Sequence, residues 1–269
     1  MGQTGCLDTE DGKSLATEDI RARLCLFAVL PNLGDVSRLD GEMAELGKAV
    51  DVSVEVAVPG LPSLFIELTG GRCMTRLGSL SSGGKPDATL AFASAGDFNR
   101  TFLSRGTAFP EQGLDAQRCF PPELARRRDR LVTYLERGDD TPEDPGFLVL
   151  RVQIKLQVAA FAVPVLLECD SRARLFRSAL GNRSILLQVM PDGPSVGLRL
   201  GPDGVLPVRE QIAEPGAALL MRDLRVANAF LDRRLDSNVA VAQGDIETWG
   251  QIPSLDALNM VLDRVPDYL

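Results

Sequence analysis

Apolar and polar positions along this chain predict helices and strands in an order that occurs twice. Near the start, apolar residues at helical spacing over residues 20–33 and 36–46 predict helices, and alternation over 52–58 predicts a strand. Further strands are expected at 64–68, 73–77 and 88–92, and further helices at 97–103 and 121–135. A run of strands between runs of helices is typical of an α+β fold.

A long apolar segment at residues 147–167 opens the second part of the chain. It is long enough to cross a bilayer, but it contains Arg151, Lys155 and Pro164, and a charge at the bilayer centre costs several kcal/mol. We therefore expect a buried core helix. The elements expected near the end of the chain are a strand at 217–221, a helix carrying Val226, Phe230 and Leu231, a strand through Val239 and Val241 to Gly244, and an amphipathic helix at 252–269.

A polar segment at residues 136–146 separates the two parts. It combines prolines, turn residues and like charges, which is typical of a linker. A chain of 269 residues also has room for two domains of roughly 130 residues each. We expect a disordered leader at 1–16, one domain at 17–135 and a second at 147–269.

Short motifs recur in both parts in the same order. Phe27-Ala28-Val29 returns as Phe161-Ala162-Val163, and the strand at 62–68 returns at 194–200 with apolar inward positions in both copies. Tyr134-Leu135 returns as Tyr268-Leu269. Self-similarity at the size of a domain indicates tandem duplication of a whole fold, because a solenoid repeat would be far shorter.

Composition and charge argue against several classes of function. The net charge of -8 and the pI of 4.8 argue against nucleic acid as a partner, because phosphate binding requires a basic surface. The chain has no histidine, so the commonest general base and the commonest neutral metal ligand are both missing. Five scattered cysteines without a C-x-x-C pair predict reduced thiols rather than disulfides or a zinc site.

The remaining motifs give no catalytic set. Cys169 lies between Glu168 and Asp170, which disfavour its thiolate, and no phosphate-binding glycine loop is present. The run Arg126-Arg127-Arg128 is interpreted as a solvated helix face. The first residues lack the basic start and apolar core of a secretory signal, so a cytoplasmic protein is expected. We predict that the chain is not an enzyme and uses no cofactor or metal.

The repeated order of elements resembles the sterol carrier protein 2 family of small lipid-binding domains. The residues that carry this resemblance are a Pro-x-Ala-x-Leu segment that leads into a strand, a helix with Phe-Leu, and Gln-Gly-Asp-Ile at 243–246 before the closing helix. The second half resembles the family better, since Gly113-Leu114 stands where Gly-Asp-Ile would be expected in the first. The resemblance implies two domains, each a mostly antiparallel five-stranded sheet covered by helices. It also implies an apolar tunnel that in some members holds fatty acyl chains, sterols or other lipids, and bacterial relatives serve in isoprenoid-quinone synthesis or as appended domains of transferases.

Apolar residues on the inner face of each sheet are the candidate ligand contacts. In the second half they are Val196, Leu198, Leu219, Phe230, Leu231, Val241, Trp249 and Ile252. In the first half they are Leu64, Ile66, Leu90, Phe98, Phe102 and Leu103. Each position also fits a closed core, because apolar residues at these spacings are more often core than ligand contact.

Two functional hypotheses follow. In the first, one or both halves bind and carry a hydrophobic small molecule, such as a fatty acyl lipid, a sterol-like molecule or an isoprenoid, with transient contact with a membrane surface. In the second, side chains such as Phe98, Phe102 and Phe230 fill the tunnels, and the chain acts as an accessory or interaction module in lipid or quinone metabolism. An internal cavity would favour the first hypothesis over the second.

Overall fold

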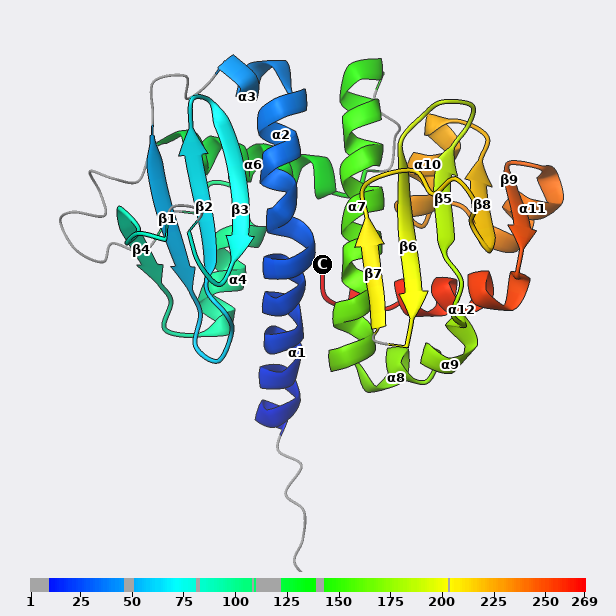
Figure 1. Ribbon diagram of the computed structural model, residues 1–269, viewed down its shortest axis with the longest axis horizontal. Helices are drawn as coiled ribbons and strands as arrows, with labels where there is room; N and C mark the ends of the chain where they lie inside the picture. Colours follow the sequence, from blue (N-terminus) through cyan, green and yellow to red (C-terminus); the bar gives the residue numbers. More distant parts are fainter. Residues whose placement is uncertain are drawn as a thin grey trace, which may run out of the picture.

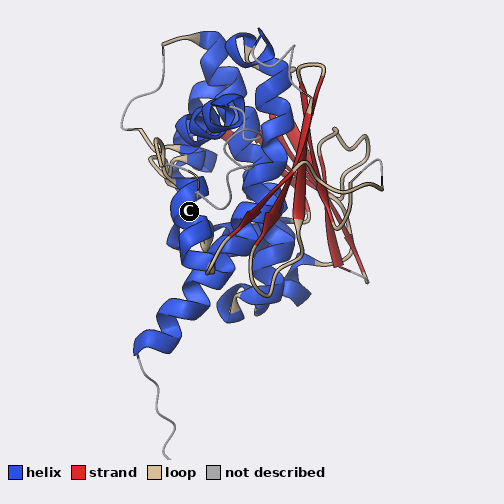
Figure 2. Ribbon diagram, turned by 90° about the vertical axis from the view of Figure 1, so that its left-hand side faces the viewer, coloured by secondary structure: helices blue, strands red, loops and turns tan. Residues whose placement is uncertain are grey.

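The structure is a computed structural model that describes residues 10–45, 51–80, 83–107, 109, 122–138, 143–202 and 204–269. It contains two sheets and a set of helices. Figure 1 shows one sheet on each side of a central pair of long helical segments. In the turned view of Figure 2, the strands lie toward one side and most helices toward the other. The structure therefore confirms a mixed arrangement of helices and sheets.

The first half is built around a long helical segment and a small sheet. Its elements are α1 (Glu10–Leu24), the π-helical turn η1 (Cys25–Val29), the 3-10 turn η2 (Leu30–Asn32), α2 (Leu33–Leu39), α3 (Gly41–Glu45), β1 (Val52–Ala57), β2 (Leu64–Thr69), β3 (Arg72–Leu77), β4 (Ala88–Ala91), α4 (Ala95–Leu103) and α6 (Pro122–Leu135). Residues 10–16, which we expected to lack structure, are helical, because a helix that has formed extends cheaply by one hydrogen bond per residue. Residues 1–9 lie outside the described residues.

The second half repeats this plan. Its elements are α7 (Pro145–Cys169), α8 (Ser171–Arg174), α9 (Arg177–Leu180), β5 (Ile185–Val189), β6 (Ser195–Gly201), β7 (Gly204–Val208), β8 (Ala217–Met221), α10 (Leu224–Leu231), α11 (Ser237–Gln243), β9 (Ile246–Gly250), α12 (Ile252–Leu262) and the 3-10 turn η3 (Val265–Asp267). By length and composition α7 is able to span a membrane, but most of its apolar stretch is buried against the protein. The prediction of a core helix is confirmed.

The two sheets share the order of their first four strands. The first sheet has the order β3-β2-β1-β4, and the second has β7-β6-β5-β8-β9. In both, the pair β1–β4 or β5–β8 is parallel and the other pairs are antiparallel. The registers also match, since Val54 is opposite Ile66 and Ala88, while Ile185 is opposite Leu198 and Ala217. The segment that carries Gly113-Leu114 lies outside the described residues.

One predicted strand is wrong. The segment with Val239 and Val241 forms helix α11, and the strand follows it as β9. Alternating valine and alanine fit a strand, but both ends of the segment carry helix caps. The Asp236 carboxylate accepts hydrogen bonds from the N–H groups of Asn238 and Val239, and Gly244 ends the helix at a φ of 74°. The last helix is also shorter than expected and ends at Leu262.

The two halves pack against each other through their long helical segments. Segment η1 contacts α7, and the core residues of both halves form one contiguous cluster. Arg209 joins the halves, because its guanidinium donates to Gln157 (2.6 Å) and to the carbonyl oxygen of Pro31 (3.0 Å) and pairs with Asp35. The same guanidinium lies over the ring of Phe161, 5.1 Å from its centroid.

A buried aspartate closes each half in the same way. Asp40, at the end of α2, accepts hydrogen bonds from Arg130 (2.5 Å) and the Tyr134 hydroxyl (2.5 Å) of α6. Its oxygen Oδ1 also accepts the N–H groups that open α3. The carboxylate thus ties the final helix of the first half to the long helical segment.

Asp170 does the same in the second half. At the end of α7 it accepts from Arg264 (2.9 Å) and the Tyr268 hydroxyl (3.0 Å), and from the first N–H groups of α8. Burial opposes ionisation of Asp40 and of Asp170, but these hydrogen bonds outweigh it, so the pKa of each carboxyl lies below its ordinary value. The equivalent positions in the two halves therefore carry the same chemistry.

Candidate functional site

A cavity of about 820 Å³ lies at the junction of the two halves. Its apolar walls come from helices of both, and they include Leu103 and Leu135 from the first half and Val158, Phe230 and Leu231 from the second. A volume of this size is typical of sites for small molecules and is far larger than one water molecule requires. The cavity is therefore the candidate binding site.

Equivalent positions of the two halves line this cavity. Val132 and Leu135 of α6 correspond to Pro266 and Leu269 at the end of the chain, since Tyr134-Leu135 and Tyr268-Leu269 follow equivalent arginines. The cavity consequently exists only where the two halves meet. It differs from the tunnel within each half that the family resemblance implies.

Buried charges form the polar part of the cavity wall. Lys155 of α7 is 8% exposed, and its ammonium group pairs with Asp232 and donates to the carbonyl oxygen of Glu136 (3.1 Å). Asp232, which directly follows α10, is 6% exposed and also pairs with Arg151 (3.3 Å). Arg151 in turn donates to the side-chain oxygen of Asn228 (3.0 Å). Every member of this cluster has a partner, which buried charges require.

Burial shifts the ionisation of Lys155. Loss of solvation disfavours the ammonium form and lowers the pKa to about 8, although the hydrogen bond and charge of Asp232 act in the opposite direction. The neighbouring cations Arg151 and Arg137 add to the lowering. The amine is therefore held close to its ionisation point at neutral to mildly alkaline pH.

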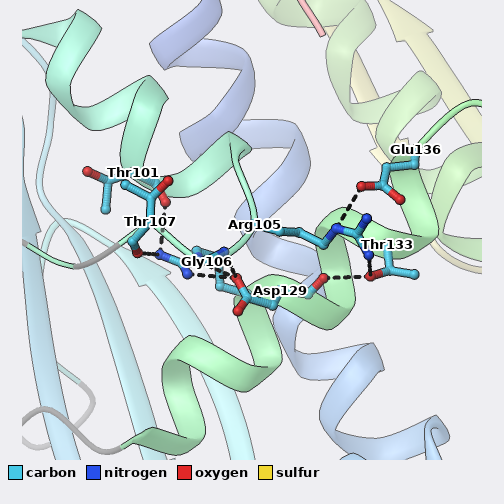
Figure 3. A network of polar contacts seen from close by, with 8 residues as sticks. Thr101, Arg105, Gly106, Thr107, Asp129, Thr133 and Glu136 are labelled. Carbon is cyan, nitrogen blue, oxygen red and sulfur yellow. Dashed lines mark hydrogen bonds and ion pairs between the residues drawn. The ribbon is translucent and has the colours of Figure 1, made fainter.

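A polar network fixes the first-half side of the cavity (Figure 3). Arg105 reaches Glu136 with an ion pair of 2.8 Å, and the N–H of Gly106 donates to Asp129 (3.2 Å). These contacts hold the loop after α4 against α6. Because the carbonyl oxygen of Glu136 accepts from Lys155, the network also positions the buried ammonium group.

The prediction of a solvated arginine run in α6 is wrong for two of its members. Arg127 and Arg128 are buried, and Arg128 donates to the carbonyl oxygens of Thr101 (3.0 Å) and Thr107 (2.6 Å). The guanidinium of Arg128 also lies over the ring of Phe109, 4.7 Å from its centroid. Arg127 donates to the Ser37 hydroxyl (2.8 Å) and to the carbonyl oxygen of Met43 (3.4 Å), so both arginines have structural roles.

The structure brings three of the predicted contact residues to the cavity, namely Leu103, Phe230 and Leu231. Others pack in the closed core beneath the sheets: Leu64, Ile66, Leu90, Phe98, Phe102, Val196 and Leu198 are buried, and Leu219 packs against them partly buried. The remaining three, Val241, Trp249 and Ile252, are exposed. The predicted inner face is thus mostly core.

Trp249 lies on the opposite face of its sheet. It pairs with Ala218 across β8 and β9, whereas the core side of β8 carries Ala217, Leu219 and Met221. Its side chain is 59% exposed and borders an open cleft of about 550 Å³ on the outer face. The prediction that it faces the inner surface is wrong, because β9 starts after α11 and its inward positions are shifted from those expected.

Sequence reasoning missed Arg21, Lys155 and Asp232. The charges of α7 were visible as polar positions in an apolar helix, Arg151 and Lys155 being one turn apart. Their partner lies far away in the sequence, and only the packing of α10 against α7 reveals it.

Thiol and metal chemistry have little support in the described part of the chain. Cys25 and Cys73 are buried, and burial raises the pKa of both thiols, that of Cys73 to about 11. In the residues that the structure describes, no group of three or more metal-ligating side chains lies together.

No protein-family model matches the chain, and no curated protein matches it. Among solved structures, it is similar to one described as a UbiJ-SCP2 ubiquinone synthesis protein. The likeness covers 39% of this chain and 94% of that chain, at 17% sequence identity and a TM-score of 0.30. At this level of likeness, the function of the chain is argued from its own residues.

Proposed function

We propose that this chain binds and carries a hydrophobic small molecule, such as a fatty acyl lipid, a sterol-like molecule or an isoprenoid, in the junction cavity. The observation that carries the proposal is the cavity of about 820 Å³, which has apolar walls from both halves. Burial of an apolar ligand there is favoured by roughly 25 cal/mol for each Å² removed from water. The activity proposed is carriage without catalysis, in the cytoplasm.

We also propose that the halves are duplicated copies of one sterol carrier protein 2-like unit. The shared strand order and the matching clusters around Asp40 and Asp170 support this origin. On this view, duplication created the junction cavity, because a single copy would lack half of its wall.

A direct test uses displacement of a fluorescent fatty acid together with native mass spectrometry of the purified protein. The variant Ala159→Phe places a ring in the cavity wall, and Ala242→Phe adds the same ring at an exposed position of α11. We expect Ala159→Phe to weaken binding by about tenfold or more, since the ring occupies ligand volume, and Ala242→Phe to leave it unchanged. Equal binding by both variants, or no binding by the unaltered protein, would contradict the proposal.

A second function has support from the first half alone. The rings of Phe92, Phe98, Phe102 and Phe109 contact one another, with centroids 5.0 to 5.9 Å apart. Such a cluster fills the interior with aromatic side chains, as the hypothesis of an interaction module requires. In this version the chain serves as a protein-interaction or accessory module, for example in lipid or quinone metabolism.

A further inference from the structure

We propose that the ligand of the junction cavity is an amphiphile with one anionic head group, a carboxylate or a phosphate, and that Arg21 receives this group. The inference rests on the proposed function and specifies its ligand. It is drawn from a difference between two equivalent positions, one in each long helical segment.

Arg21 and Lys155 occupy equivalent positions. Each lies at the same distance before the repeated Phe-Ala-Val motif, and each lines the junction cavity. A helix packs against each long segment at this point, α4 in the first half and α10 in the second. Each of these helices carries an asparagine that bonds to a residue about one turn before the cation. Asn99 of α4 donates to the carbonyl oxygen of Glu18 (2.9 Å), and Asn228 of α10 accepts from Arg151 (3.0 Å).

The two cations differ in their partners. Asp232 lies nine residues after Asp223, the N-cap of α10, and it pairs with Lys155. The residue at the same position after the cap of α4, Ser94, is Leu103. Leu103 therefore lines the cavity together with Arg21, where a carboxylate at the equivalent position pairs with Lys155.

Arg21 consequently keeps an unused donor. Its Nε is buried and has no hydrogen-bond partner, and its ion pair with Glu18 joins another nitrogen at 3.9 Å. A buried donor without an acceptor is costly, and nearly all such groups in proteins find a partner. Nε itself is closed off from the cavity, but the Arg21 side chain as a whole is 40% exposed and lines the cavity, so an anionic oxygen there can pair with the accessible part of the guanidinium.

The carboxylates around the cavity do not fill this role, because each has partners elsewhere. Glu136 pairs with Arg105, Asp263 pairs with Arg233, and Asp236 caps α11. The fourth, Asp232, is held by Lys155. Against these four carboxylates, the cavity wall carries five cationic side chains, namely Arg21, Arg137, Lys155, Arg233 and Arg234.

The apolar wall and the cation define the ligand together. Leu103 and Leu135 suit a hydrocarbon chain, and the Arg21 guanidinium suits a carboxylate or phosphate, which accept charge-assisted hydrogen bonds. A sterol or a neutral isoprenoid offers the guanidinium a neutral acceptor at most, and such a hydrogen bond is weaker than one to a carboxylate or a phosphate. The geometry therefore favours an acidic lipid over a neutral one.

The test compares a fluorescent fatty acid with its methyl ester, which has the same chain without the charge, and adds hexadecyl phosphate as a competitor. We expect the unaltered protein to bind the acid about tenfold more tightly than the ester, as one charge-assisted contact allows. Arg21→Gln should remove most of this preference and leave ester binding within about twofold, because the glutamine keeps much of the wall. Stronger displacement by hexadecyl phosphate than by palmitate would assign the site to phosphate, and the reverse would assign it to carboxylate.

Arg100→Gln serves as the matched control. This arginine is in the same half, and its side chain is 71% exposed on α4. It should behave as the unaltered protein does. Circular dichroism and a thermal melt establish that Arg21→Gln is folded.

Three outcomes would overturn the inference. If acid and ester bind equally well, the head-group assignment fails while the binding function stands. If Arg21→Gln weakens both equally, the residue serves the fold rather than the head group. If neither probe binds, the proposed function fails together with the inference.

Discussion

The two halves retain the same polar anchor but fill their interiors differently. Asp40 holds an arginine and a tyrosine of α6, and Asp170 holds the equivalent arginine and tyrosine in the segment after α12. The interiors that these anchors enclose differ. In the first half Phe92, Phe98 and Phe102 form a ring cluster, whereas the second half has Met221, Ala227 and Leu231 at the equivalent places.

This difference shows which parts of the plan are interchangeable. A buried carboxylate with several partners tolerates little change, because removal of any one partner leaves another group unpaired. Apolar positions tolerate exchange when the total volume is kept. The anchors therefore define the scaffold, and the side chains between them decide whether the interior is closed or opens onto the cavity.

The largest expected effect is on stability, and it differs between the interiors of the two halves. Phe102→Ala should lower the free energy of unfolding by about 4 kcal/mol, because it opens a cavity in a closed ring cluster. Leu231→Ala, at the equivalent position, should cost about 1–2 kcal/mol, because that side chain is only partly buried at the cavity wall. Urea denaturation measures both. Leu231→Ala should also alter ligand affinity, and an equal cost for both variants would show that the interiors do not differ in this way.

The two anchors should respond alike. Asp40→Ala and Asp170→Ala should each cost about 3 kcal/mol, because each removes a buried partner of an arginine and a helix cap. Since the pKa of each carboxyl is lowered in the folded state, its contribution is present above the ordinary value of 3.8 and is lost as the pH falls below it. Asp97→Ala, at the exposed start of α4, is the control. A cost below about 1 kcal/mol at either anchor would break the equivalence of the halves.

Much of this scaffold could be predicted from the sequence. The repeated strand at 62–68 and 194–200 has the register that the repeat implies, because apolar alternation fixes which face of a strand is buried. The strand at 239–244 was mistaken because the alternation of valine and alanine ignores Asp236 and Gly244, which cap a helix. Local caps decided the structure there against the apolar pattern.

The site was much harder to predict. The sequence showed Lys155 as a charge in an apolar helix, but it did not show that Asp232 would be its partner. The cavity also lies between the halves rather than inside either one, so the predicted contact residues include only Leu103, Phe230 and Leu231 of its wall, all on helices α4 and α10. Contacts between distant parts of the chain depend on packing, and no local pattern specifies them.

The smallest of these expected effects compares the two cations of the cavity. Burial lowers the pKa of Lys155 to about 8 from an ordinary value of 10.5, so between these values the unfolded chain binds more protons than the folded one. Stability should therefore rise with pH in this window, by about 2 kcal/mol between pH 8 and 9.5. Lys155→Met should abolish this rise.

Urea denaturation at pH 7, 8, 9 and 9.5 gives the free energy of unfolding of the unaltered protein and of each variant. The difference between the two is then followed across the pH range. Cys25 has a raised pKa and lowers the stability of all variants alike as the pH rises past its ordinary value of 9.0, so it cancels in the difference. Arg21→Met should leave the rise intact, because arginine stays charged throughout this range. If Lys155→Met keeps the rise, or Arg21→Met removes it, the ammonium of the second half is not the group that titrates. The pairing of Lys155 with Asp232, which Arg21 lacks, would then not explain the pH dependence of stability.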